Sequence, residues 1–517
     1  MPFALAVLAS LLSGVFGAAF AVIWHRAFTF ASGDAASTTP LVLAAYLVGI
    51  AEGAWFARWL CERYMRPKLL RALGMLVIAA GVLGFLVIPV LVRVVYIAVW
   101  GWGLPFVALT AAVIGSVAPL VSHLAIAPDD RAGTRVSYVV AASLVGSMLG
   151  WLLGAVVLLD VAGIDANARF LALGGLVIGA AVAINTAHGR ERLAWAAGVA
   201  ALASGIGLSE HRLYFKLYER LLFKEHYYHD TFMRVVENRH GVVAITPQHQ
   251  LIGNGVYDGD ARVDVDDQGN RLVRALGVAA LHRDPRHVLM LGLGSGVWTH
   301  VIAGLPSIED ITVVESNPGY RQLLSSSRGV APLLRNSHVR FIDEEPRRWL
   351  ALHGDEHFDV VIANEPASWR AQSSALFSVE FMRLVRDHLV DGGLFYFNTT
   401  GALDAYRTAF EVFPFGLRVA NFAAVSMSPV DFDLTRWQRV LSAYRLNGAA
   451  PFNPTSPAGT QRLAAFLAMP GDRKGWYGSP MLETRAAMLA RLQGATPITD
   501  DNMGGEWRTV YPVVYVP

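Results

Sequence analysis

Seven apolar segments in the first part of the chain constrain its fold more than any other feature. A hydrocarbon layer about 30 Å thick requires about 20 apolar residues in a helix, because backbone amides inside the layer must bond within the segment. The segments approach this length, and they cover residues 3–23, 41–60, 72–91, 105–126, 137–159, 169–186 and 193–208. We therefore expect residues 1–208 to form an all-α transmembrane bundle of about seven spans.

Charge is divided unevenly along the chain. Only 20 of the 84 Asp, Glu, Lys and Arg residues lie before residue 209, so a polar, globular part follows the apolar part. The net charge is +2, which leaves no strongly basic surface to neutralise phosphates, and nucleic acid is excluded as an expected partner. The single cysteine, Cys61, excludes a disulfide framework and a thiolate zinc site, and we expect no metal.

The polar part begins with two short regions. Residues 209–230 mix charges and aromatics at helical spacing and are expected to form an amphipathic connector. Residues 231–284 contain the alternating runs FMRVVEN, GVVAIT and ARVDVDD, separated by Gly and Asn, followed by a helical pattern near 271–282. This alternation predicts a small antiparallel β-subdomain with a lead-in helix.

A glycine turn between a strand and a helix is the most informative local motif. The run HVLML (287–291) predicts a buried strand, Gly292, Gly294 and Gly296 follow it, and the run ITVVE predicts a second strand that ends at Glu315. Such glycines allow a ligand to approach the backbone, and an acid about 20 residues later accepts ribose hydroxyls. The motif predicts a nucleoside site.

The alternation of strands and helices continues through VRFIDEEPRRWL, FDVVIANEP and LFSVEFMRLVRDHLVDGGLFYFN. This pattern is typical of a doubly wound sheet. We expect a nucleoside-binding Rossmann-like core over residues 285–400, and a C-terminal extension over 401–517 that completes the domain. The expected fold is therefore multi-domain, with an α-helical membrane bundle and an α/β part.

At these motifs the sequence resembles the spermidine synthase family, whose methyltransferase-type Rossmann sheet follows a small β-domain. The order of Asp266–Asp267, VLMLGLGSG, VVESNP, FDVVIANEP, ALFSVEFM and LVDGGLF matches the family over residues 220–400. AVIWHRAF, GIAEGAWFARWLCER and TPITDDNMGGEWR are similar to segments of its membrane-fused branch, in which a major-facilitator-like helical half precedes the synthase-like domain.

The resemblance implies an adenosyl sulfonium cofactor, which is S-adenosylmethionine or its decarboxylated form. Attack of an amine on a carbon beside the positive sulfur is the chemistry that such a cofactor supports. Cofactor contacts are implied for the three glycines, for Glu315 at the ribose, for Glu345 or Asp343 at the adenine, and for Asp258. The implied partners are a small-molecule amine or related acceptor and the lipid bilayer, with homodimer formation left open.

Departures from the family pattern affect the acceptor side. Soluble spermidine synthases carry a catalytic aspartate in a D-S-S-D-P segment, whereas this chain has Asn364 and Glu365 before Pro366, and Glu365 is the nearest replacement. The residues that help to bind the diamine fall on Asn270, Arg271 and Leu272, and Arg271 argues against putrescine. Substrate contacts are assigned to four carboxylates, Asp266, Asp267, Asp500 and Asp501; the last two could equally belong to an Asx turn.

Three functions are compatible with these features. Aminopropyl transfer to an amine in polyamine metabolism is favoured because the order of the family's motifs is kept. A methyltransferase would need the same glycine turn and would explain the lost diamine residues. A non-enzymatic transporter or sensor with a nucleoside-binding domain is the third.

The loops of the predicted bundle give conflicting expectations about orientation. Nine basic residues lie on one side, Arg58, Arg63, Arg66, Lys68, Arg71, Arg131, Arg135, Arg190 and Arg192, and three on the other, Arg26, Arg93 and Arg169. The positive-inside rule then puts the N-terminus in the cytoplasm, and seven spans put the C-terminal part outside. We expect a multi-pass protein of the cell membrane, in a bacterium the inner membrane, with its catalytic domain in the cytoplasm, and regard the span count as the weaker assumption.

Overall fold

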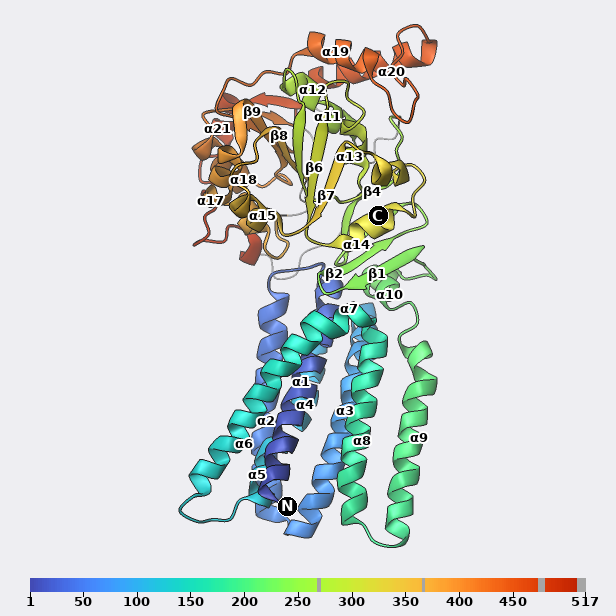
Figure 1. Ribbon diagram of the computed structural model, residues 1–517, viewed down its shortest axis with the longest axis vertical. Coiled ribbons are helices and arrows are strands. Elements are labelled where there is room, and N and C mark those ends of the chain that lie inside the picture. Colours follow the sequence, from blue (N-terminus) through green and yellow to red (C-terminus); the bar gives the residue numbers. More distant parts are fainter. Residues whose placement is uncertain (267–270, 365–367, 473–478, 509–517) are drawn as a thin grey trace. The chain divides into compact units, whose positions relative to one another are not determined.

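The computed structural model describes residues 1–266, 271–364, 368–472 and 479–508, and these fall into two compact units. The helical unit consists of residues 1–231 and 237–241. The α/β unit consists of residues 232–236 and the described residues from 242 onward. Each unit is described by itself below (Figure 1).

The described part of the helical unit contains seven helical stretches long and apolar enough to cross a membrane, which agrees with the expected number. Two of them are composite and include a short segment of another helix type. The stretches are α1 (Phe3–Ser32), α2 (Thr38–Arg63), α3 (Arg66–Ile97), η1–α4–α5 (Trp100–Gly103, Leu104–Gly115, Val117–Ala125), α6–η2–α7 (Ala132–Leu152, Leu153–Leu158, Leu159–Val161), α8 (Ile164–Thr186) and α9 (Arg190–Leu213).

Glycines allow the long helices to approach closely. A Cβ atom at Gly146 of α6 would lie 2.0 Å from the Leu11 carbonyl oxygen of α1, and one at Gly14 would lie 2.2 Å from the Ser143 carbonyl oxygen. A Cβ atom at Gly53 of α2 would lie 2.0 Å from a carbonyl oxygen of α4. Small residues at helix crossings are the usual means of packing apolar helices in the absence of water.

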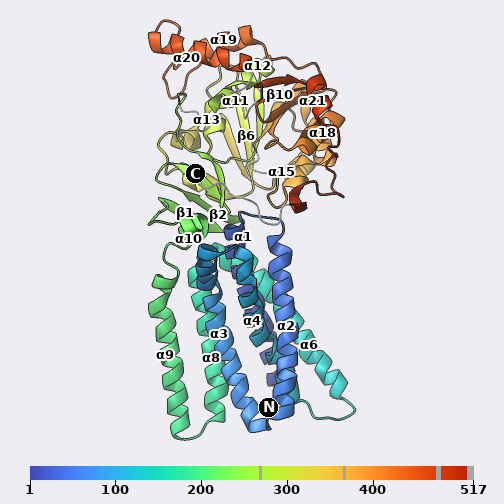
Figure 2. The same cartoon turned by 180° about the vertical axis from the view of Figure 1, so that it is seen from behind.

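Helix α9 runs alongside α8 (Figures 1 and 2). Arg169, near the start of α8, forms an ion pair with Glu210, near the end of α9. At the other end of α9, Glu191 lies 3.1 Å from Arg71 of α3. The short helices α10 (Leu217–Phe223) and η3 (Lys224–His226) follow α9. The expected connector therefore begins inside α9 and not after it.

A four-stranded sheet precedes the main sheet, in the order β1 (Arg234–Asn238), β2 (Gly241–Ile245), β3 (Gln250–Gly253) and β4 (Val256–Asp260). β2, β3 and β4 pair antiparallel, as expected. The expectation of a strand in ARVDVDD is wrong for the described residues 261–266, because the third and fourth strands lie before this run. The lead-in helix is divided into α11 (Leu272–Leu276) and α12 (Val278–Leu281).

The main sheet has eight described strands in the order β12-β10-β11-β9-β8-β5-β6-β7. Neighbours from β9 to β7 are parallel, and β11 is antiparallel to β9. The expected Rossmann-like sheet is confirmed by this arrangement. The strands are β5 (His287–Leu291), β6 (Asp310–Glu315), β7 (Val339–Asp343), β8 (Phe358–Ala363), β9 (Leu389–Asn398), β10 (Phe415–Val419), β11 (Phe422–Ser426) and β12 (Leu482–Thr484).

Both faces of the main sheet are buried. Alternate side chains of β5 and β8 enter two separate hydrophobic clusters: Met290 and Ile362 belong to one, and Leu289 and Val361 to the other. Parallel sheets are stable only when both faces are covered, which explains the nearly continuous apolar runs of these strands. The covering segments are α13 (Val297–Ile302), α14 (Pro318–Leu324), η4 (Ala331–Arg335), α15 (Pro346–Leu352), α16 (Ser373–Phe377), α17 (Val379–Asp387), α18 (Leu403–Val412), α19 (Leu434–Ala443), α20 (Pro457–Ala468), η5 (Met469–Gly471), α21 (Arg485–Arg491) and η6 (Glu506–Arg508).

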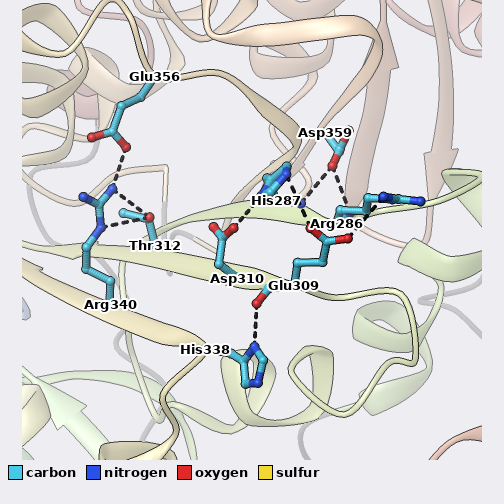
Figure 3. Close-up of polar contacts among 9 residues, drawn as sticks. All are labelled: Arg286, His287, Glu309, Asp310, Thr312, His338, Arg340, Glu356 and Asp359. Carbon is cyan, nitrogen blue, oxygen red and sulfur yellow. Dashed lines mark hydrogen bonds and ion pairs between the residues drawn. The ribbon is translucent and has the colours of Figure 1, made fainter.

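A polar network ties together the amino-terminal edge of the central strands (Figure 3). One carboxylate oxygen of Asp359, near the start of β8, accepts hydrogen bonds from the backbone N–H groups of Arg286 and His287 at 2.9 and 2.8 Å. His287 also contacts Asp310, and this hydrogen bond raises the pKa of the imidazole. The charged residues at this edge are engaged in contacts within the fold. A ligand-binding site is therefore expected at the opposite, carboxyl edge of the sheet.

Candidate active site

The glycine turn lies at the carboxyl edge of the main sheet, between β5 and α13. Gly292, Gly294 and Gly296 all have positive φ angles, of 85°, 49° and 71°, which residues with a Cβ atom rarely adopt. The N–H of Gly292 donates to the Val314 carbonyl oxygen of β6 at 2.9 Å. A Cβ atom at Gly294 would lie 3.2 Å from the Asp258 carbonyl oxygen. The three glycines are therefore required by the backbone path itself.

Glu315 ends β6 beside this turn and is buried, with 9% of its surface exposed. Its carboxylate accepts hydrogen bonds from the N–H groups of Leu293, at 2.8 Å, and Asn317, at 2.7 Å. Burial, and then the charge of Asp258, raise the pKa of Glu315, while these hydrogen bonds act in the opposite direction. The Ser316 hydroxyl also donates to Oε1, at 3.4 Å, whereas Oε2 accepts only from Leu293 among the described residues. Oε2 therefore keeps a lone pair for a further donor such as a ribose hydroxyl.

Two carboxylates assigned to the adenine lie at the next strand end. Asp343 ends β7, directly beside Glu315 in the register, and forms an ion pair with Arg321 at 2.6 Å. Glu345 caps α15 by accepting from the N–H groups of Arg347 and Arg348 at 3.0 and 2.7 Å. Glu345 therefore has a structural role that the sequence analysis did not foresee.

Asp258 lies on β4 in a buried charged cluster. Its side chain is 5% exposed, pairs with Arg370 at 3.0 Å and accepts a hydrogen bond from the Tyr320 hydroxyl. Burial, followed by the charge of Asp258, raises the pKa of Tyr320 well above its ordinary value. Sequence reasoning missed Tyr320 and Arg370. Because Arg370 is 112 residues from Asp258, no local pattern could reveal the pair.

The catalytic candidates follow β8. Asn364 is exposed directly after the last residue of that strand, and its Oδ1 atom accepts a hydrogen bond of 3.4 Å from Asn398 Nδ2 at the end of β9. Glu365 lies outside the described residues, as does Asp267 among the substrate candidates. The structure therefore places Asn364 at the same edge as the glycine turn and leaves the assignment of Glu365 a prediction.

Three of the substrate carboxylates are described. Asp266 forms a two-pronged ion pair with Arg462, with contacts of 2.5 to 2.9 Å, and Asp500 forms a similar pair with Arg347 at 2.5 and 2.8 Å. The hydrogen bonds from these arginines lower the pKa of both aspartates. Asp501 is exposed next to Asp500. Asp266 and Asp500 are thus compensated by cations within the fold.

A buried glutamate secures the segment after the catalytic candidates. Glu506 is 2% exposed, and its carboxylate accepts from the N–H groups of Gln372 and Ser374 at 2.9 and 3.0 Å. These residues begin α16, a few positions after Arg370. The segment TPITDDNMGGEWR, which contains Glu506, could be recognised from the sequence, but its contact with Gln372 and Ser374 could not.

The arrangement at the carboxyl edge fits an adenosyl group. Three features lie along this edge: a backbone turn that requires glycine, the buried Glu315 carboxylate, and acids at the end of the next strand. Open α/β sheets bind their ligands at this edge.

Comparisons with known proteins extend over much of the chain. No family model matches it. Polyamine aminopropyltransferase 2 of Ralstonia nicotianae is 27% identical over 433 residues, which cover 78% of this chain and 80% of the relative. Polyamine aminopropyltransferase 1 of the same organism is also 27% identical, with 78% of both chains covered. Spermidine synthase in complex with the transition-state analogue AdoDATO is 16% identical, with a TM-score of 0.35, and the match covers 46% of this chain and 85% of that chain.

Proposed function

We propose that this chain transfers an aminopropyl group to an amine acceptor, as its similarity to the two polyamine aminopropyltransferases of Ralstonia nicotianae supports. The donor would be decarboxylated S-adenosylmethionine, whose positive sulfur makes the neighbouring carbon open to attack. A C–N bond forms, the C–S bond breaks with its electron pair going to sulfur, and the amine loses a proton. The observation that carries the proposal is the glycine turn with buried Glu315 beside it.

We assign the donor-binding roles to the groups that lie along the carboxyl edge of the main sheet. Glu315 would accept from the ribose hydroxyls, and Gly292, Gly294 and Gly296 would let the nucleoside approach the backbone. Asp343 or Glu345 would accept from the adenine amino group. Asp258, held by Arg370 and Tyr320, would contribute negative charge near the sulfonium.

The acceptor-side roles are a base and a set of positioning groups. Glu365 would accept the amine proton, with Asn364 beside it at the end of β8. Of the four carboxylates assigned to the substrate, Asp267 and Asp501 would raise the local concentration of a cationic amine. Asp266 and Asp500 are already paired with Arg462 and Arg347, so their part in substrate binding would require these ion pairs to open. Proximity of amine and donor supplies much of the rate in such a reaction.

The helical unit would anchor the protein in a cell membrane. The seven apolar helical stretches support this part of the proposal, with the bilayer as partner. The α/β unit would face the cytoplasm, where the nucleoside donor is made. A methyltransferase and a nucleoside-binding transporter or sensor become outcomes of the test below.

The donor assignment is tested by replacing the buried acid with Glu315→Ala in the full chain purified in detergent. Loss of a charged hydrogen bond to the ribose should weaken binding of the decarboxylated donor by about 1.5 to 3 kcal/mol in calorimetry. Glu309→Ala, which removes an exposed acid at the amino edge (Figure 3), is the matched control and should bind normally. Equal affinity in the two variants would reject the ribose role of Glu315.

The reaction is tested by incubating the protein with each sulfonium donor and a panel of amines. Aminopropyl transfer releases methylthioadenosine from the decarboxylated donor. Release of adenosylhomocysteine from S-adenosylmethionine would instead assign methyl transfer. Donor binding without any turnover would favour the non-enzymatic alternative.

A further inference from the structure

A chain of three asparagine amides runs from a half-buried arginine to the catalytic candidate Asn364. Arg274 of α11 donates through Nη1 to Asn421 Oδ1 at 2.6 Å. Asn421, just before β11, donates through Nδ2 to Asn398 Oδ1 at 2.7 Å. Asn398, at the end of β9, donates through Nδ2 to Asn364 Oδ1 at 3.4 Å. The relay therefore joins an arginine to the reacting edge of the sheet.

The direction of every hydrogen bond in this relay is fixed by chemistry. A guanidinium group has no acceptor atom, so the group that Arg274 meets on Asn421 must be the oxygen. The backbone N–H of Thr400 also only donates, and it donates to Asn398 Oδ1 at 2.9 Å. Two independent donors thus orient the Asn398 amide, and its NH₂ group must point toward Asn364.

Arg274 is held firmly at the start of the relay. Its guanidinium lies 5.6 Å from the centre of the Trp298 ring and 5.2 Å from that of Phe422, and these two rings stack on one another at 4.9 Å. The Tyr396 hydroxyl donates to the Arg274 carbonyl oxygen at 3.2 Å. A fixed cation at one end polarises successive amides in the same sense, which strengthens the last donor.

Asn364 consequently presents a donor to the site. Its Oδ1 atom is engaged by Asn398, and within the described part of the chain no group accepts a hydrogen bond from its Nδ2 atom. An alkylammonium group has donors only and cannot accept from this amide. The register of β5 and β8 pairs Leu291 with Ala363, so Asn364 follows its strand at the same level as Gly292 of the glycine turn.

From this geometry we infer that the ligand group bound at Asn364 is a carboxylate, so that the natural substrate pair contains an amino acid and not only bare amines. The inference rests on the proposed function and narrows its substrate class. Two sources could supply the carboxylate: an amino-acid acceptor, or S-adenosylmethionine, which would then replace the decarboxylated donor proposed above.

Matched ligands that differ by one carboxylate separate the two sources. Ornithine differs from putrescine by a carboxylate, and S-adenosylmethionine differs in the same way from its decarboxylated form. Calorimetry on the full chain should show a preference of about tenfold or more for the carboxylate-bearing member of one pair, as expected for one charge-assisted hydrogen bond. A preference in the first pair assigns an amino-acid acceptor, and one in the second pair assigns the donor.

An isosteric variant should invert this preference. In Asn398→Asp, a carboxylate oxygen replaces the Nδ2 group that faces Asn364, and this oxygen can only accept a hydrogen bond. The Asn364 amide must therefore rotate so that its NH₂ group points to residue 398 and its oxygen points to the ligand. The preferred carboxylate ligand should lose at least about tenfold in affinity, while the partner without the carboxylate should bind as well or better. Asn364→Asp makes the same change at an exposed position and serves if Asn398→Asp does not fold.

Asn336→Asp is the control, because it adds the same charge at an Asn that only accepts from the backbone of His338, outside the site. It should leave the preferences unchanged. Equal affinity within both pairs in the unaltered protein, or an unchanged preference in both relay variants, would overturn the inference. Failure of the proposed function is recognised separately in the turnover assay, where transfer of the side chain with release of methylthioadenosine would be absent, whereas the ligand preferences are measured by binding alone.

Discussion

At the scale of single residues, Glu315 combines two opposing influences. Burial makes its negative charge costly, and the N–H groups of Leu293 and Asn317 compensate part of this cost. A buried acid of this kind binds protons more tightly than in the unfolded chain, where its pKa is near the ordinary 4.5. Its contribution to stability is therefore present at low pH and is lost as the pH rises through the raised pKa.

This raised pKa predicts a link between donor binding and proton release. Ribose hydroxyls donate to the ionised carboxylate and lower its pKa, so binding should release protons and strengthen as the pH rises through the raised pKa. Calorimetry at about pH 5 in two buffers of different ionisation enthalpy measures the released protons. In Glu315→Gln the release should vanish, and a release that persists in this variant would assign the proton to another group.

The sequence predicted which residues end the strands, but not which side chains meet there. Glu315 and Asp343 could be placed because alternation and turn residues define the ends of β6 and β7. The resemblance to the spermidine synthase family, confirmed by the two Ralstonia relatives, supplied the expected roles. The relay from Arg274 through Asn421 could not be read, because it depends on the pairing of β9 with β11 and on side chains 147 residues apart.

At the scale of elements, the segment 368–374 depends on a residue from far along the chain. Glu506 accepts from the N–H groups that begin α16, and Ser374 Oγ donates to the Met503 carbonyl oxygen. Ser368 N–H is held separately by the Thr400 hydroxyl at 3.1 Å. The position of Arg370, and through it of Asp258, is thus set by contacts with two other segments.

Removing the Glu506 carboxylate should loosen this segment. Glu506→Ala leaves the buried N–H group of Ser374 without its acceptor, at a cost of about 1 to 3 kcal/mol, and frees the more exposed N–H group of Gln372. Amide hydrogen exchange should become faster in residues 372–374 and remain unchanged in β5 and β6. Glu506→Gln keeps an acceptor oxygen and should restore part of the protection. Uniform exchange across the α/β unit in Glu506→Ala would instead indicate global unfolding.

At the scale of the whole molecule, the number of helical crossings determines which groups share a compartment. The Arg169–Glu210 ion pair joins one end of α9 to α8, and the Arg71–Glu191 ion pair joins its other end to α3. Both contacts support α9 as a full-length seventh crossing. Seven crossings would separate the loops that carry the nine basic residues from everything after residue 213. With seven crossings, the basic loops and the α/β unit cannot both lie in the cytoplasm.

Labelling in intact cells tests this separation. With Cys61→Ser as background, single cysteines at Ala132 and Ser428 should react with an impermeant maleimide from opposite sides of the membrane. The proposed function requires protection of the cysteine at residue 428 in intact cells, because the α/β unit must meet a cytoplasmic donor. Reaction of both cysteines from one side would show that the chain crosses an even number of times.

The late position of Glu506 also has a consequence for how the protein is made. During translation the apolar helices leave the ribosome first, and the strands β5 to β9 follow about 100 residues later. Roughly 500 residues must be synthesised before the carboxylate that secures the start of α16 emerges. The nascent chain can therefore form its helices and most of its sheet before Glu506 is available to order the start of α16.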